Sequence, residues 1–146
     1  LLAVSNPGLR DTDIITPHPG EAARLLVCST AEVQQDRFAA AAALQSRVGC
    51  AVVLKGAGSI VAAHGLPPAV IGAGNPGMGV GGMGDVLTGV IAALRGQGFA
   101  APAAATIGAL LHAAAGDAAA LDDGERGLLP SDLLPWLRRL ANPMRR

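Results

Sequence analysis

A glycine-rich loop that leads directly into a helix constrains the fold of this chain more than any other feature. Seven of the thirteen residues from Gly72 to Gly84 are glycine, and the apolar helical segment Asp85–Leu94 follows without a break. Each glycine loses about 0.5 to 1 kcal/mol more free energy than alanine when it is ordered, so such a loop needs a compensating role. The usual role is close approach of backbone amides to an anion, and a helix start adds unpaired N–H groups and partial positive charge. The pattern therefore predicts a phosphate site.

Short apolar runs alternate with helical segments along the rest of the chain. The run Ala51-Val-Val-Leu54 lacks polar alternation, which is typical of a strand buried on both faces. Strands are predicted at residues 13–16, 51–54, 60–63 and 69–71. Helices are predicted at residues 21–27, 29–48, 85–94 and 102–120, followed by a short helix capped by Ser131 and a frayed basic end at 143–146. Strands that alternate with helices, with no internal linker, predict one layered α/β domain.

Composition argues against several classes of function. The 11 basic and 11 acidic side chains cancel, and the chain has two Phe, one Trp and no Tyr, so neither electrostatic nor stacking interactions with nucleic acid are expected. Cys28 and Cys50 have no Cys-x-x-Cys or His partners, which predicts free thiols and a reduced, cytoplasmic location. The apolar stretch 100–116 is shorter than the roughly 18 to 20 residues of a membrane span. We expect neither nucleic acid nor membrane as a partner.

Asp85 follows the last glycine of the loop and lies at the start of the predicted helix. A carboxylate repels a phosphate unless it has a task of its own, and an ionised Asp can accept the proton of an attacking hydroxyl, which contributes about 10²- to 10⁴-fold in rate. The alternative is that Asp85 is the N-cap residue of the helix, a role that Asp commonly fills. The spacing alone leaves both interpretations open.

Two further polar residues follow predicted strands. Lys55 is the one lysine beside ten arginines, and a compact ammonium before Gly-Ala-Gly-Ser suits contact with nucleotide phosphates, the alternative being a solvated strand end. His18 lies between two prolines at the end of the first strand, where open α/β sheets bind ligands, although a lone histidine is more often a loop residue. Glu21 either caps the following helix or lies near a metal.

Other phosphate-binding patterns fit poorly. The Walker pattern is absent, and the formal Gly-x-Gly-x-x-Gly match at residues 77–82 lacks the acidic residue expected roughly 20 positions later. His64 lies in a predicted turn and His112 in an alanine-rich helix, which favours structural roles for both. Arg126, before Gly127, is only a weak anion-binding candidate.

Three segments taken together resemble the ADP/ATP-dependent NAD(P)H-hydrate dehydratases. They are Thr16-Pro-His-Pro-Gly-Glu21, Val53-Leu-Lys-Gly-Ala-Gly-Ser59 and Gly74-Asn-Pro-Gly-Met-Gly-Val-Gly-Gly-Met-Gly-Asp-Val-Leu-Thr-Gly89, in family order over essentially the whole chain. The resemblance implies a ribokinase-like, layered αβα fold with a mostly parallel sheet, of which residues 1–146 are the C-terminal portion. It also implies a homo-oligomer, and an epimerase domain fused upstream in the full-length protein.

The resemblance further implies a lyase that repairs nicotinamide cofactors. Such enzymes dehydrate (S)-NADHX or (S)-NADPHX to NADH or NADPH by phosphorylation of the hydrate hydroxyl and elimination of phosphate. The co-substrate is ADP or ATP, and Mg²⁺ is expected on its phosphates. By resemblance, Asp85 is the catalytic base and contacts the hydrate together with His18. The nucleotide-binding residues are Lys55, Gly56, Ala57, Gly58, Ser59 and Gly84.

The sequence departs from the family at Gly79 and Val80, which replace a small residue and a hydroxyl residue, so one side-chain hydrogen bond of the expected anion site is missing. Two alternatives remain. A ribokinase-like kinase for a small molecule such as a vitamin precursor would leave a stable phosphorylated product, and a non-catalytic fragment would bind nucleotide without turnover. The choices between ADP and ATP and between NADHX and NADPHX stay open.

Overall fold

The computed structural model describes residues 8–142, and the predicted frayed end at 143–146 lies outside this range. Helical and extended segments alternate as the sequence predicts. In chain order the elements are β1 (Ile14–Ile15), α1 (Pro19–Leu26), α2 (Thr30–Gln35), α3 (Arg37–Val48), β2 (Ala51–Leu54), β3 (Ser59–Ala62), β4 (Ala69–Ile71), the 3₁₀ turn η1 (Pro76–Met78), α4 (Met83–Gly96), α5 (Ala101–Asp123), the 3₁₀ turn η2 (Pro130–Asp132) and α6 (Leu133–Leu140).

The four strands of the described residues form one sheet in the order β1-β2-β3-β4. β1 pairs with β2 in parallel, with Ile14 opposite Ala51, whereas β2–β3 and β3–β4 are antiparallel. This corrects the expected mostly parallel sheet, because the part described here is mixed. The connections at 55–58 and 63–68 are far shorter than the dozen or so residues that a parallel crossover needs.

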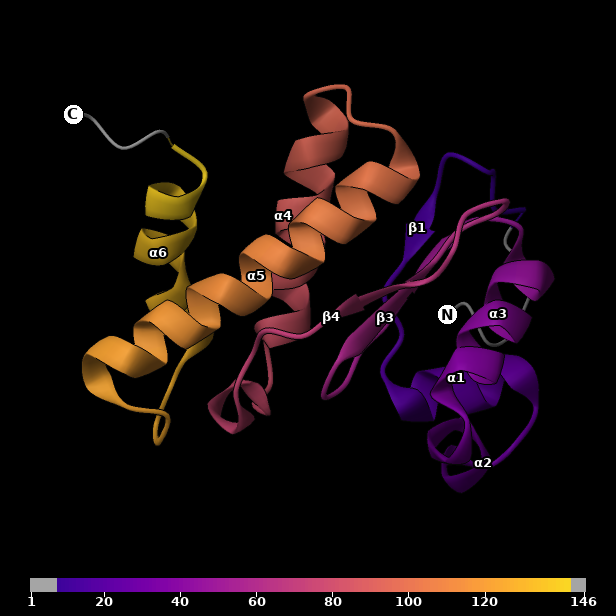
Figure 1. Cartoon of the computed structure of the whole chain (residues 1–146), viewed down its shortest axis with the longest axis horizontal. Coiled ribbons are helices and arrows are strands. Elements are labelled where there is room, and N and C mark those ends of the chain that lie inside the picture. Colours follow the sequence, from indigo (N-terminus) through magenta and orange to yellow (C-terminus); the bar gives the residue numbers. More distant parts are fainter. Residues whose placement is uncertain (1–7, 143–146) are drawn as a thin grey trace.

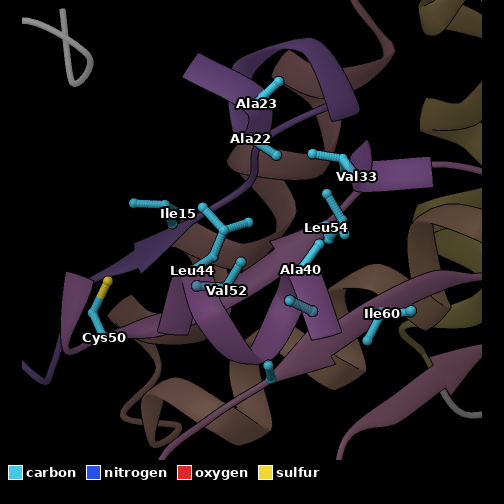
Figure 2. Close-up of a cluster of buried hydrophobic side chains, with 12 residues drawn as sticks. Ile15, Ala22, Ala23, Val33, Ala40, Leu44, Cys50, Val52, Leu54 and Ile60 are labelled. Atoms are coloured by element: carbon cyan, nitrogen blue, oxygen red, sulfur yellow. The ribbon is translucent and has the colours of Figure 1, made fainter. Parts of the chain in front are cut away.

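Helices cover both faces of the sheet, so the predicted α/β layering is confirmed (Figure 1). Val52 and Leu54 of β2 pack into a cluster with α1, α2 and α3, and the intervening Val53 packs into a second cluster with α4 and α5. Figure 2 shows the first cluster, in which Leu44 of α3 is fully buried. The unbroken apolar run of β2 therefore reflects burial on both faces, as predicted.

The single helix predicted over 29–48 is divided into α2 and α3 at Asp36. The predicted Ser29–Glu32 capping box is present at the start of α2. Asp36 leaves the helical conformation, with φ −142° and ψ 88°, and its Oδ1 accepts a hydrogen bond from Ala39 N at 2.9 Å. A short polar side chain that captures a backbone N–H competes with helix continuation in this way. The break gives α3 its own N-terminus at Arg37.

α5 is longer than the predicted helix and runs for 23 residues. Its length and hydropathy would suffice to cross a membrane, contrary to the expectation for the apolar stretch 100–116, but half of its apolar window is buried within the fold. Its buried positions are all Ala or Gly, which lets neighbouring elements approach closely. At Gly108, an added Cβ would lie only 2.6 Å from Ile91 Cγ1 of α4. The helix therefore occupies the place of a core helix against α4 and the sheet.

Candidate functional site

The ends of β1 and β2 define one edge of the sheet. Lys55 N donates a hydrogen bond to Pro17 O at 2.9 Å, which continues the parallel pairing beyond both strands. His18 directly follows Pro17, and Lys55 itself makes this last contact through its N–H. Because the C-terminal ends of neighbouring parallel strands share an edge, both side chains leave the sheet at the place where α/β proteins bind ligands.

His18 is the N-cap residue of α1. Its Nδ1 accepts hydrogen bonds from Gly20 N at 3.1 Å and Glu21 N at 3.3 Å, while Glu21 Oε2 accepts one from His18 N at 2.8 Å. Glu21 therefore completes a capping box, which confirms the capping interpretation of this residue. With Nδ1 used as an acceptor, a neutral imidazole carries its proton on Nε2, which lies 3.6 Å from Glu21 Oε1 on a half-exposed ring.

The Lys55 side chain reaches from the end of β2 to the start of α4. Its Nζ lies 4.0 Å from Glu21 Oε2, and a Cβ added to Gly84 would lie 2.9 Å from the same nitrogen. The side chain is only 26% exposed, so a freely solvated strand end does not describe it. The ammonium therefore lies between α1 and α4, directly against the last glycine of the loop.

The residues from Lys55 to Ser59 make the turn between β2 and β3. Both of its glycines have positive φ, +146° at Gly56 and +64° at Gly58, which residues with a Cβ rarely adopt. Ser59 Oγ donates to Gly56 O at 3.2 Å. Sequence analysis did not single out Arg37, yet its guanidinium donates hydrogen bonds to carbonyls of this turn. A charged residue at the first position of a helix is ordinarily solvent-exposed, so the sequence gives no signal for the contact between Arg37 and this turn.

The start of α4 has no side-chain cap. Its N-cap residue is Gly82, with φ +91°, and Asp85 is the third residue of the helix. The N-cap interpretation of Asp85 is therefore wrong. Within residues 8–142, no hydrogen bond involves the Asp85 carboxylate, and the residue is exposed. Asp85 thus presents a free carboxylate beside the helix start, although its catalytic role stays a prediction.

Hydrogen bonds hold the start of α4 beside the end of β1. Thr88 Oγ1 donates to Gly84 O at 2.9 Å and lies 3.3 Å from Thr16 Oγ1. Together with the Lys55–Gly84 contact, this brings His18, Lys55 and Gly84, with the adjoining Asp85, to the same edge of the sheet. Segments separated by up to about seventy residues in sequence therefore meet where the resemblance implies a common site.

The glycine-rich loop is fixed to α5 and to the segment that follows it. Asp117 accepts hydrogen bonds from Gly74 N at 2.8 Å and Asn75 Nδ2 at 3.1 Å. At Gly77, an added Cβ would lie 2.3 Å from Glu125 O, so this glycine permits close backbone packing and needs no ligand to explain it. Gly81 has neither positive φ nor a neighbour within 4 Å, which leaves open space above this part of the loop.

His112 lies in the middle of α5, behind the start of α4. Burial lowers the pKa of His112, a backbone contact with Met83 opposes that shift, and the Lys55 ammonium lowers the pKa further. Its Nε2 is buried without a hydrogen-bond partner. His64 lies in an exposed turn. These positions agree with the structural interpretation of both residues.

A surface hollow of about 260 Å³ lies between the end of α5 and α6. Arg126, the weak anion-binding candidate, lines it together with Arg139 and Trp136, but Asp122, Asp123 and Asp132 line it as well. This mixture of charges gives it no clear preference for an anion. Among residues 8–142, this hollow included, no group of three His, Cys, Asp or Glu side chains is arranged to hold a metal ion, and both cysteines are free.

The chain matches known proteins of one family. Residues 1–139 match the Carb_kinase family, described as NAD(P)H-hydrate dehydratase. The bifunctional NAD(P)H-hydrate repair enzyme Nnr of Escherichia coli K12 is 52% identical over 143 residues, which are 98% of this chain and 28% of that enzyme. The chain thus spans less than a third of the length of this relative.

Solved structures share the fold. The ADP/ATP-dependent NAD(P)H-hydrate dehydratase of Bacillus subtilis, co-crystallised with ATP/Mg²⁺, superposes with a TM-score of 0.81 at 29% identity over 87% of this chain and 46% of that one. A ribokinase-like superfamily protein of Enterococcus faecalis V583 superposes with a TM-score of 0.72 at 28% identity over 93% of this chain and 47% of that one. The predicted ribokinase-like α/β class is confirmed, over about half the length of each of these proteins.

Proposed function

The chain belongs to the NAD(P)H-hydrate dehydratase family. We propose that the site formed by His18, Lys55, Gly84 and Asp85 dehydrates (S)-NADHX or (S)-NADPHX to NADH or NADPH, with ADP or ATP as phosphoryl donor. One observation carries this proposal. The Lys55 ammonium lies against Gly84, and so joins the candidate nucleotide-binding turn to the helix start that bears Asp85. The names of the E. coli and B. subtilis relatives support the same reaction.

The nucleotide is bound by the turn 55–59 and the start of α4. Lys55 supplies a positive charge to the phosphates, and Gly84 allows both the ammonium and a phosphate to come close to the backbone. Within residues 8–142, the N–H groups of Met83 and Gly84 have no hydrogen-bond acceptor in the protein. Unpaired amides at the N-terminus of a 14-residue helix favour an anion there.

The hydrated nicotinamide is held between His18 and Asp85. His18 donates from Nε2, because Nδ1 is used in capping α1. Asp85 accepts the proton of the ring hydroxyl while the hydroxyl oxygen bonds to the terminal phosphorus and the bond from phosphorus to the nucleotide breaks. Loop and helix amides stabilise the charge that develops on the phosphoryl oxygens. Phosphate then leaves with the C–O electron pair, the ring nitrogen supplies electrons, and loss of a proton from the neighbouring carbon restores the double bond.

Mg²⁺ fits this site as a companion of the nucleotide. The described residues lack a cage of three ligating side chains, and Mg²⁺ is ordinarily bound by one or two carboxylates together with substrate phosphates. The ligands of the ion would then be mostly phosphate oxygens and water, and the bound ion would neutralise phosphate charge.

Further properties of the full-length protein follow as proposals. The E. coli relative is named bifunctional, which supports a fused epimerase domain upstream of this chain. The free cysteines Cys28 and Cys50 support a reduced, cytoplasmic location. Association into a homo-oligomer is proposed on the family resemblance alone.

Recovery of nicotinamide absorbance tests the proposed reaction. NADHX is incubated with ADP or ATP and Mg²⁺, and the near-ultraviolet absorbance of NADH is followed for this chain and for a form extended at its N-terminus. We expect recovery with the extended form, accompanied by free phosphate. A folded extended form that binds nucleotide yet restores no NADH would contradict the proposal. A stable phosphorylated product would indicate the kinase alternative, and binding without turnover the non-catalytic one.

A further inference from the structure

Arg37 is the first residue of α3, and its side chain crosses to the turn between β2 and β3. The guanidinium donates hydrogen bonds to Ala57 O, to Leu54 O at 3.3 Å and to Lys55 O at 3.4 Å. Its Nε is buried without a partner, so the side chain is enclosed at its base. One carbonyl from the end of β2 and two from the turn therefore point toward one planar cation, whose several N–H donors have a fixed arrangement.

These carbonyl contacts determine where the neighbouring amides point. In a trans peptide, the C=O and the following N–H lie in one plane and point in opposite directions. With Lys55 O and Ala57 O turned toward Arg37, the N–H groups of Gly56 and Gly58 point away from it. Neither N–H has a hydrogen-bond acceptor within residues 8–142. The turn thus exposes two donors on the side opposite the guanidinium.

The glycines of the turn are adapted to this arrangement. A Cβ added to Gly56 would lie 2.8 Å from Arg37 Nη2, and Gly56 and Gly58 both have positive φ. A residue with a Cβ at position 56 would push the guanidinium away and also strain the backbone. The conformation of the turn and the position of Arg37 therefore depend on each other.

We propose that Arg37 is a positioning residue for the nucleotide: it holds the turn between β2 and β3 so that the Gly56 and Gly58 amides donate to phosphate oxygens beside Lys55. This inference rests on the proposed function. It assigns Arg37 no direct contact with substrate. Arg37 acts through the backbone of the turn, which is why its loss should weaken nucleotide binding more than binding of the hydrated nicotinamide at His18.

The test compares Arg37→Ala and Arg37→Lys with Arg47→Ala in the N-terminally extended form. Arg47 lies on the same helix and is exposed, so its removal is a matched loss of charge. Calorimetric titration gives the Kd for ADP and ATP, kinetics give the KM for the hydrate, and thermal unfolding checks the fold. We expect Arg37→Ala to raise the nucleotide Kd about tenfold or more while the hydrate KM and the Arg47→Ala protein change by less than about twofold. Added guanidinium ion should restore part of the affinity of Arg37→Ala alone.

Equal nucleotide affinity of Arg37→Ala and Arg47→Ala would overturn the inference, and so would a parallel loss of nucleotide and hydrate affinity. If Arg37→Ala fails to fold, Arg37→Lys decides the question, because one ammonium cannot hold three carbonyls in the same geometry and unchanged affinity would overturn the inference. A wild-type protein that binds nucleotide but repairs no hydrate contradicts the proposed function only, since the nucleotide Kd values of the Arg37 and Arg47 variants still test the inference. A wild-type protein that binds no nucleotide overturns both.

Discussion

In the turn between β2 and β3, Gly56 and Gly58 both have positive φ, whereas only two of the seven glycines between residues 72 and 84 do. The turn needs glycine for its backbone angles. In the longer loop, Gly74 and Gly82 have positive φ, whereas Gly77 and Gly84 leave space: a Cβ at Gly77 would collide with the backbone at Glu125, and one at Gly84 would meet the Lys55 ammonium. Glycine content alone therefore does not identify an anion site, because the same residue type serves two different purposes here.

The two segments also differ in what holds them. A cation, Arg37, binds carbonyls of the turn, while an anion, Asp117, binds an N–H and a side-chain amide of the loop. The first arrangement leaves N–H groups free and the second uses one. Under the proposed function, the turn would therefore supply amides to the nucleotide, and the loop would supply the helix start and Asp85.

Replacing Asp85 by Asn is expected to have the largest effect, and it tests whether catalysis and nucleotide binding depend on different segments. Asn keeps the size of the side chain but cannot accept the hydroxyl proton, so we expect turnover in the extended form to fall by at least about 10²-fold. Nucleotide affinity should change little, because the proposed phosphate contacts come from the turn and Lys55. The measurements are the rate of phosphate release from NADHX plus ADP or ATP, and the nucleotide Kd. Retained turnover would remove Asp85 from the mechanism.

Replacing Asp117 by Asn tests how the loop is held. The carboxylate accepts two hydrogen bonds at the start of the loop, and its loss should lower the free energy of unfolding by about 2 kcal/mol. Chemical denaturation measures this change. Asp122→Asn, an exposed position on the same helix, provides the control. If both variants unfold alike, the Asp117 contacts do not anchor the loop.

Much of the secondary structure could be predicted, because local sequence patterns and the fold agree. The buried run of β2, the Ser29–Glu32 capping box and the ends of β1 and β2 all lie where sequence patterns place them. The division of helix 29–48 was missed because Asp36 looks like an ordinary helix-surface residue until its carboxylate captures Ala39 N. The mostly parallel sheet is implied by the family resemblance alone, whereas the four-residue connection at 55–58 is too short for a parallel crossover.

The sequence indicates the candidate residues at this edge of the sheet, but it does not indicate the contacts between them. Motif order indicated Lys55 and Gly84 separately, and only the fold shows that the ammonium lies against that glycine. Arg37 and Asp117 carry no local signal, since each acts on backbone 17 or more residues away. Long-range contacts between a charged side chain and backbone have no period or spacing that a single sequence reveals.

Replacing Gly84 by Ala tests the contact between Lys55 of the turn and Gly84 at the end of the glycine-rich loop. The new Cβ would lie 2.9 Å from Lys55 Nζ, the flexible end of a side chain, so the ammonium should move at little cost in stability. Loss of its phosphate contact should raise the nucleotide Kd about tenfold. Gly89→Ala, on the same helix with no neighbour within 4 Å, should bind nucleotide as the wild type does. Equal nucleotide Kd values for the two variants would show that the position of Lys55 does not matter for binding.

The smallest expected effect concerns His112 in α5, whose pKa is affected by both Met83 and Lys55. Burial lowers the pKa of His112 below its ordinary value of 6.5 in the folded protein, and the Lys55 ammonium adds to that shift. As the pH falls through about 6.5, the unfolded chain therefore binds a proton that the folded protein does not, and the free energy of unfolding decreases. Between about pH 7.5 and about pH 5.5, His112→Asn should lose less stability than the wild type, with slopes that differ by less than about 1.4 kcal/mol per pH unit. Because His18 and His64 are present in both proteins, the difference in slope reports His112, and parallel curves would show that it titrates alike in the folded and unfolded states.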